Sequence, residues 1–409
     1  MRHIDLGELE KDHRPEALSD AQAAALARTG LVLVQPRGNG EWQLTPSGLV
    51  GAAEAGDVLL QVHPKDKIGV SQLLFLLGYA RDPGFRPDDN AGERASDLWS
   101  ALAESFARQC EVALSRGVLH GYLSVDDALR TVRGRIRMAD QISRRPGMLL
   151  PLEVTYDDHT ADIAENRLLR TALRRLLGLN RVSSAARKRL AHLDRRLDGV
   201  TLLQGGAPLP RWQETRHNQR YIPALRLAEI ILRNSAAETG VGGIRVASFR
   251  VNMAKIFEDF VEVALSEAVA DLGAPGGIER QFPAKLDQAD PAGNHRIRMN
   301  IDAVYRTGKD VSPVVFDAKY KVASNNNNYA NADHYQMLAY CTALKASTAW
   351  LVFAGAGQHR SLRIVNTEVT VNEYPLDLSQ HPDVVLDRVR QLAGLAVGPL
   401  HAIPRLGFA

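Results

Sequence analysis

The order of helix-like and strand-like segments in the last part of the chain limits its fold more than any other feature. The predicted elements are a helix at 251–269, strands at 278–285, 296–305 and 314–321, a helix at 331–345, and strands at 349–354 and near 361–371. The resulting order α-β-β-β-α-β is typical of a mixed α/β domain. We therefore expect residues 241–409 to form one domain around a sheet.

The third of these strands ends in the stretch F-D-A-K-Y-K at 316–321. Strand side chains alternate between the two faces of a sheet, so Asp317 and Lys319 should lie on one face. Asp302, 15 residues earlier, also interrupts an apolar strand. If the two strands pair, Asp302 and Asp317 approach each other closely.

Two neighbouring carboxylates repel each other unless a proton or a cation lies between them. Mg²⁺ is held in proteins by one or two carboxylates and several waters, so Asp302 and Asp317 are candidate metal ligands. Lys319 could then orient or deprotonate a water, or offset the charge of a phosphate. The alternative is that both acids are solvated strand ends and that Lys319 is their surface partner.

Further candidates flank these strands. Glu258 lies on the preceding amphipathic helix, although Asp259 and Glu262 are close to it in sequence. Gln336 and Tyr340 are four residues apart on the following helix and should share one face of it. Glu258 could instead be an exposed helix residue, and Gln336 a capping or packing residue.

Asp302 together with D-A-K at 317–319, in this order of elements, resembles the PD-(D/E)xK nuclease superfamily. The Q-x-x-x-Y at 336–340 resembles the additional motif of its RecB-like branch. Asn300-Ile301-Asp302 stands where Pro-Asp is common, although Asp302 itself is present. The resemblance implies a restriction-endonuclease-like core and Mg²⁺-dependent hydrolysis of DNA.

A closer resemblance is to the McrC family, the nuclease subunits of McrBC modification-dependent restriction systems, and it covers roughly 57–345. It is carried by L-L-Q-V-H-P-K at 59–65, L-L-F-L-L-G-Y-A at 73–80, V-R-G-R-I at 132–136, E-N-R-L-L-R-T-A-L at 165–173 and K-I-F-E-D-F-V at 255–261. It implies an McrB-like AAA+ GTPase hexamer as partner, which the chain stimulates, and DNA containing modified cytosine as substrate. Carried over by position, the catalytic set is Asp302, Asp317 and Lys319, with Glu258 and Gln336 as further candidates.

The middle of the chain is basic. Residues 130–200 contain 16 Arg and Lys against 8 Asp and Glu, whereas the net charge of the whole chain is only +3. Such a belt suits an anionic polymer, and it is equally compatible with solvated helix faces. Arg133 and Arg135, in V-R-G-R-I, could contact DNA or reach into a partner ring, or could pair with the acidic stretch at 153–165.

We also include Lys321 and Tyr340 as candidate DNA contacts. No G-x-x-x-x-G-K-[ST] is present, so we expect this chain to bind no nucleotide itself and to depend on a partner for any NTP-driven step. A charged N-terminus, no run of about 18 apolar residues and only two cysteines predict a cytoplasmic protein without membrane contact.

Three domains are predicted: a β-rich domain at 1–92 that docks the partner, a helical basic region at 93–240, and the nuclease domain at 241–409. The Pro- and Gly-rich stretches at 81–92 and 240–243 mark the boundaries. Two alternatives stay open. The chain could be a non-catalytic activator of an AAA+ NTPase, or a stand-alone RecB-like exonuclease.

Overall fold

The computed structural model describes residues 2–10, 12–64, 68–80, 98–179, 182–239, 245–290, 297–308, 313–320 and 331–401. They form a mixed α/β protein with several sheets, as the sequence predicts. The chain divides into two compact units, one of Met1–Leu98 with Asn234–Ala409 and the other of Trp99–Arg233. The predicted linkers at 81–92 and 240–243 lie outside the described residues, and the three-domain division stays a prediction.

The described N-terminal residues of the first unit form two sheets and two helices. Its elements are β1 (Arg2–Gly7), β2 (Glu16–Ala17), α1 (Asp20–Thr29), β3 (Val32–Gly38), β4 (Glu41–Pro46), β5 (Val50–Ala55), β6 (Val58–His63) and α2 (Val70–Tyr79). Ser19 begins α1 with a capping box, because its side chain accepts from the backbone of Gln22 and the Gln22 side chain accepts in return. Gly69 is the N-cap residue of α2, and this cap makes no side-chain hydrogen bond.

Two strands from much later in the chain complete the larger of these sheets. β10 (Ser235–Thr239) and β11 (Arg245–Val251) give a five-stranded sheet in the order β1-β6-β5-β11-β10. β11 pairs antiparallel with β5, and Phe249 stands opposite Ala52. The N-terminal sheet is therefore built from segments about 180 residues apart in sequence.

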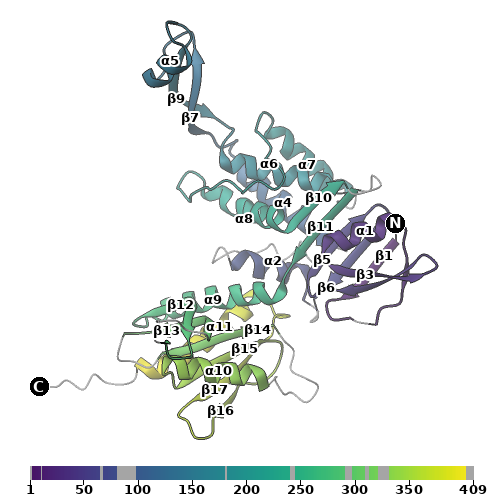
Figure 1. Cartoon of the computed structure of the whole chain (residues 1–409), viewed down its shortest axis with the longest axis vertical. Helices are drawn as coiled ribbons and strands as arrows, with labels where there is room; N and C mark the ends of the chain where they lie inside the picture. Colours follow the sequence, from purple (N-terminus) through teal and green to yellow (C-terminus); the bar gives the residue numbers. More distant parts are fainter. Residues whose placement is uncertain are drawn as a thin grey trace, which may run out of the picture. The chain divides into compact units, whose positions relative to one another are not determined.

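The second unit is helical but also contains a sheet. Its elements are α4 (Leu98–Leu114), β7 (Gly121–Leu129), β8 (Arg135–Ile136), α5 (Met138–Arg144), β9 (Leu152–Thr160), α6 (Ala164–Leu177), α7 (Ser184–Arg196), a 3-10 turn (Gln219–Tyr221) and α8 (Ile222–Asn234). The three-stranded sheet β7-β9-β8 is an addition to the helical basic region predicted at 93–240. We call residues 121–160, which hold this sheet and α5, the arm (Figure 1).

Gly134, in V-R-G-R-I, lies where β8 begins to pair with β9. Its φ of +67° is in the left-handed region, and a Cβ there would be 2.2 Å from the carbonyl oxygen of Thr155. Only glycine tolerates both conditions. This requirement explains the glycine of the motif in structural terms.

The C-terminal part of the first unit is built on a six-stranded sheet. Its elements are α9 (Met253–Asp271), β12 (Gly277–Lys285), β13 (Arg298–Arg306), β14 (Val314–Lys319), α10 (Asn331–Leu344), β15 (Thr348–Ala354), β16 (Arg360–Arg363), β17 (Thr370–Leu376) and α11 (Pro382–His401). The predicted order α-β-β-β-α-β is present from α9 to β15. The single strand predicted near 361–371 is wrong, because two antiparallel strands, β16 and β17, occupy this region.

The strands of this sheet follow the order β12-β13-β14-β15-β17-β16. β13 runs antiparallel to β14, and β15 runs parallel to it. α10 packs its Met337 and Cys341 on one face, against Val315, Leu351 and other core residues, while α9 and α11 pack together and cover the other face (Figure 1). None of the helices in the described part of the chain has the length and apolar character that a membrane span requires.

Candidate functional site

The pairing of β13 with β14 brings two of the predicted acids together. Ala303 stands opposite Phe316, so the preceding Asp302 lies beside the end of β14 where Asp317 and Lys319 are found. Asp302 Oδ2 accepts a hydrogen bond of 2.9 Å from the backbone N–H of Ala318. Its carboxylate is therefore fixed between the acid and the lysine of D-A-K.

Asp317 and Lys319 form an ion pair on the same face of β14. The Asp317 side chain is 1% exposed, and its Oδ2 lies 2.5 Å from Lys319 Nζ. Strand alternation predicts that these two side chains lie on one face of the strand. The alternative, in which Asp317 is a solvated strand end, does not agree with a side chain that is buried to this degree.

Burial and mutual repulsion shift the pKa values of these three groups. Burial, followed by the negative charge of Asp317, raises the pKa of Asp302 to about 7. Burial also raises the pKa of Asp317, against the opposing effect of Lys319. Burial alone would lower the pKa of Lys319, but the charge of Asp317 and the hydrogen bond to it raise that pKa overall.

Two glutamates of α9 extend the acidic cluster. One carboxylate oxygen from each of Glu258, Glu262 and Asp302 lies within 4.8 Å of the others. Burial raises the pKa of Glu262, and the charge of Glu258 adds to the effect. Sequence reasoning identifies Glu258 as a candidate and Glu262 only as an acid close to it. The spacing of four residues on one helix was the signal that could have identified the pair.

The cluster suits a hard divalent cation, because all of its ligand atoms are carboxylate oxygens. Asp317 is not a member of the three-residue group. However, its buried Oδ1 accepts no hydrogen bond from the described residues. A cation near Asp302 would also relieve the repulsion that raises the pKa of that residue.

α10 approaches the same strands through the Q-x-x-x-Y motif. Gln336 Nε2 donates to the hydroxyl of Tyr340, separated by 2.5 Å, and that hydroxyl donates to the carbonyl oxygen of Asn300 at 3.1 Å. Tyr340 is only 4% exposed. Both residues therefore help to fix α10 against β13, two residues from Asp302. Contact of Tyr340 with DNA stays a prediction.

The remaining predicted residues lie elsewhere. Lys321 is outside the described residues. Arg133 and Arg135 belong to the arm in the second unit, where Arg133 pairs with Asp158 at 2.9 Å and lies 4.0 Å from the centre of the Tyr156 ring. This pairing agrees with the alternative that the arginines bind the acidic stretch at 153–165. Arg135 is exposed on β8.

Several other arginines of the basic region are also paired with acids. The pairs are Arg137 with Glu153, Arg167 with Asp162, and Arg170 and Arg174 with Asp194. Their charges are therefore partly neutralised within the second unit. The number of arginines in the sequence overstates the charge available to bind DNA.

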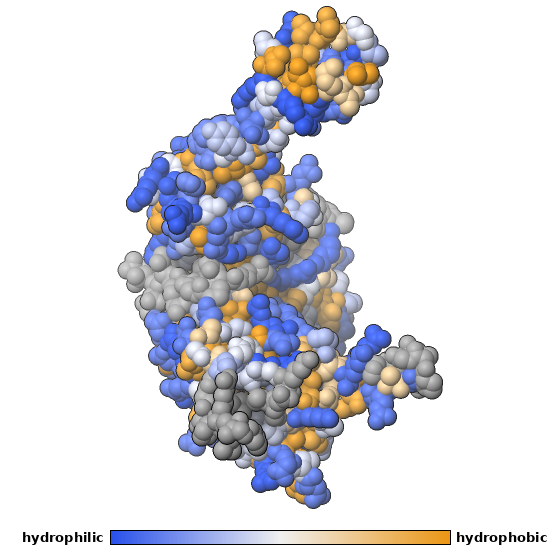
Figure 2. Space-filling view, turned by 90° about the vertical axis from the view of Figure 1, so that its left-hand side faces the viewer, coloured by the Kyte–Doolittle hydropathy of each residue, from blue (hydrophilic) through white to orange (hydrophobic). Residues whose placement is uncertain are grey.

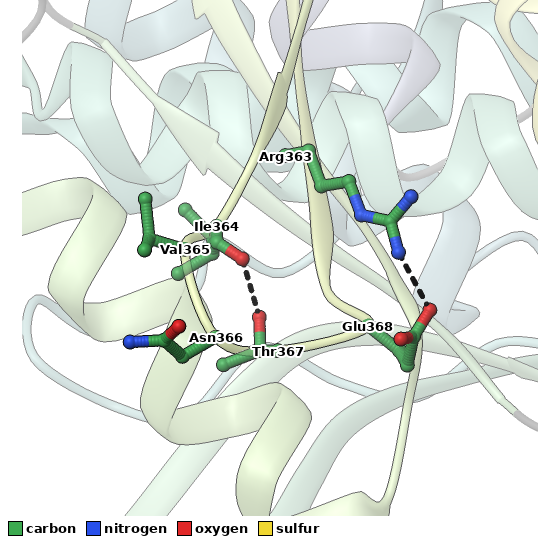
Figure 3. A pocket seen from close by; sticks show the side chains of 6 residues that line it. All are labelled: Arg363, Ile364, Val365, Asn366, Thr367 and Glu368. Atoms are coloured by element: carbon green, nitrogen blue, oxygen red, sulfur yellow. Dashed lines mark hydrogen bonds and ion pairs between the residues drawn. The ribbon is translucent and has the colours of Figure 1, made fainter.

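A hollow at the hairpin between β16 and β17 contains none of these residues. It is lined by residues 363–368, with the Arg363–Glu368 ion pair at one side (Figure 3). Its lining contains one carboxylate, that of Glu368, and this group is paired with Arg363. The carboxylate cluster beside β13 and β14 is the better candidate for chemistry.

Comparison with known proteins places most of the chain in one family. The family model for the McrBC 5-methylcytosine restriction system component matches residues 44–354. No curated protein matches the chain.

Two solved structures from Thermococcus gammatolerans are similar. A chain of the half-complex from a tetradecameric assembly of McrB AAA+ hexamers with bound McrC is 19% identical, with a TM-score of 0.62 over 95% of this chain and 99% of that chain. A chain of the cryo-EM structure of the McrBC complex is 21% identical, with a TM-score of 0.43 over 66% of this chain and 88% of that chain. At such identities, the first of these similarities is evidence of a common fold.

Proposed function

The chain belongs to the family of McrBC 5-methylcytosine restriction system components, and on that premise we propose that it is an McrC-like subunit that hydrolyses DNA with Mg²⁺. Its C-terminal domain would be a PD-(D/E)xK nuclease. The observation that carries this proposal is the meeting of Asp302, Asp317 and Lys319 where β13 and β14 pair. The order α-β-β-β-α-β around these strands supports the same assignment.

In this proposal, Asp302 and Asp317 hold the divalent ion, and Glu258 and Glu262 of the same carboxylate cluster are further candidate ligands to it. When bound, such an ion would polarise the scissile phosphate and lower the pKa of a coordinated water. The burial of Asp317 limits exchange with solvent at this end of the sheet. The carboxylates are thus held in place before substrate binds.

Lys319 would act through its positive charge. Its Nζ lies 2.5 Å from Asp317 Oδ2, and this ion pair favours the ammonium form over the neutral amine that a general base requires. An ammonium group next to the site instead stabilises the negative charge that develops on the phosphate. Of the roles that the sequence left open for this lysine, charge stabilisation is the one that its surroundings favour.

The partner would be an McrB-like AAA+ GTPase. The similar T. gammatolerans structure contains McrB AAA+ hexamers with bound McrC. In this chain, hydrophobic side chains gather at the end of the arm (Figure 2). Those more than half exposed are Val132, Met138, Ile142, Met148, Leu149 and Leu150. Exposed apolar surface of this kind marks protein interaction sites, and we propose that the AAA+ partner covers it.

The nuclease assignment is tested with the chain reconstituted with its AAA+ partner and a DNA that contains 5-methylcytosine. Asp317→Asn should abolish Mg²⁺-dependent cleavage while stimulation of the partner's GTPase continues. Glu368→Gln, which removes an 86% exposed acid on the β16–β17 hairpin, is the matched control and should cleave normally. Full cleavage by the Asp317→Asn complex would refute the assignment. If Asp317→Asn loses both cleavage and GTPase stimulation, the variant is misfolded.

A further inference from the structure

Gln281 has an unusual backbone in the middle of β12. Its φ is +50°, in the left-handed region that residues other than glycine rarely adopt. The β12–β13 ladder pairs Arg280 with Ala303 and Phe282 with Ile301, so Gln281 is the residue that faces Asp302 across the two strands. Strain of this kind persists only where the surrounding structure imposes it, and it is concentrated at functional sites.

The side chain of Gln281 connects α9 with β13. Its Nε2 donates to Glu258 Oε1 at 2.7 Å and also to Glu262 Oε1. Its Oε1 accepts from the side-chain amide of Asn300. One amide group therefore holds both glutamates of the carboxylate cluster and is itself held by the strand that carries Asp302.

These bonds continue into α10. The carbonyl oxygen of Asn300 accepts from Tyr340, whose hydroxyl is bonded to Gln336. The contacts thus run from the α9 glutamates through Gln281 and Asn300 to the Q-x-x-x-Y motif. Asp302 lies two residues from Asn300, at the centre of this arrangement.

The chemistry of the amide decides what this contact can do. Two carboxylates four residues apart on a helix repel each other, and each would turn toward solvent if nothing held it. A lysine already holds one of them, because Lys255 Nζ lies 2.8 Å from Glu258 Oε1, and its charge offsets part of the negative potential that attracts a cation. Glutamine offers two N–H donors and no charge, so Gln281 orients both carboxylates without reducing that potential further.

We propose that Gln281 is a positioning residue that holds Glu258 and Glu262 toward the divalent ion, and that its left-handed backbone is what aims its amide at α9. This inference rests on the proposed cation site. The amide itself does not contact the ion. Partners that orient metal ligands in this way typically contribute about 10- to 100-fold to metal affinity.

The test is Mn²⁺ binding to the intact chain, measured by titration calorimetry without DNA or partner. Gln281→Gly removes the amide and suits a φ of +50°, so its thermal unfolding temperature in EDTA should equal or exceed that of the wild type. Its Mn²⁺ affinity should nevertheless fall about 10-fold or more. Gln281→Met, which keeps the length of the side chain and removes its donors, should lose affinity to a similar degree.

Asn366→Gly is the matched control, because Asn366 also has a left-handed backbone, with φ +59°, on the hairpin between β16 and β17. It should leave Mn²⁺ affinity unchanged. Wild-type affinity in both Gln281 variants would overturn the positioning role while leaving the cation site in place. If neither the wild type nor the variants bind Mn²⁺, the proposed cation site fails and this inference fails with it.

Discussion

The carboxylate of Asp302 accepts a hydrogen bond from the backbone N–H of Ala318, the residue between Asp317 and Lys319. This single contact ties the isolated acid of β13 to the D-A-K triplet of β14. Because it fixes Asp302 beside a second buried acid, both carboxylates experience repulsion that neither would have alone.

In the absence of divalent ions, Asp302 should make the fold less stable as the pH rises. Its pKa of about 7 lies above the usual value of 3.8, so the folded chain holds this proton more tightly than the unfolded chain. The stabilisation from this proton is complete below about pH 4 and is lost as the pH approaches 7.

Asp302→Asn keeps the acceptor for Ala318 and removes the charge. In EDTA, its unfolding temperature relative to wild type should therefore be higher at pH 8 than at pH 5. Differential scanning calorimetry of the two proteins at both pH values measures this difference. If the difference in unfolding temperature between the two proteins is the same at both pH values, the charge of Asp302 does not destabilise the fold.

Substitutions of Lys319 should show whether this residue acts in cleavage through its positive charge or as a base that accepts a proton. Lys319→Gln should lower the cleavage rate about 100-fold, because the positive charge beside the phosphate is lost. Lys319→Arg keeps a positive charge, because the guanidinium group stays protonated across the working pH range, so it should retain much more activity than Lys319→Gln. Single-turnover cleavage by the reconstituted complex gives both rates. Equal loss in the two variants would mean that the lysine acts as a base and that charge alone is not enough.

The elements of the C-terminal six-stranded sheet and its helices could be predicted from sequence because their signals are local. Period-two alternation placed Asp317 and Lys319 on one face, and their ion pair agrees with it. Glu262 and Gln281 were missed for different reasons. Glu262 reads as one acid among several on an amphipathic helix. The role of Gln281 depends on a left-handed backbone angle, which no neighbouring residue in the sequence predicts.

Long-range pairing explains the other differences. β11 pairs with β5, which lies far earlier in the sequence, and no local pattern in either strand indicates such a partner. β7 has exposed or half-buried side chains along its whole length, so it lacks the apolar alternation of a core strand. The region around it was therefore predicted as helical. The exposed tip of the arm likewise depends on tertiary structure, because its hydrophobic residues look like core in the sequence.

Changing the tip of the arm should weaken partner binding without affecting the fold. Leu149 is 87% exposed, so Leu149→Asp removes no buried contact and places a charge in the proposed interface. Affinity for the AAA+ partner should fall about 10-fold or more, since a desolvated charge opposes association. Val365→Asp, at an 81% exposed position on the β16–β17 hairpin, is the control and should bind normally. Equal binding by the two variants would exclude the tip as the docking surface.

Gly134 offers a graded test of the arm's structure. Gly134→Ala places a methyl group 2.2 Å from the Thr155 carbonyl oxygen, in addition to the strain of φ +67°. Gly147→Ala, also in the arm at φ +75°, meets no atom within 4 Å and adds only the backbone strain, about 1–2 kcal/mol. Hydrogen exchange in β8 and β9 should therefore accelerate more for Gly134→Ala than for Gly147→Ala. The reverse order would contradict the close approach of β8 and β9.

Diffraction from crystals of the intact chain soaked in Mn²⁺ would test the cation site most directly. We predict an anomalous peak about 2.0–2.3 Å from carboxylate oxygens of both Asp302 and Asp317, and its loss in Asp302→Asn crystals grown under the same conditions. Well-ordered Mn²⁺-soaked crystals with no peak between these two residues would contradict the nuclease proposal.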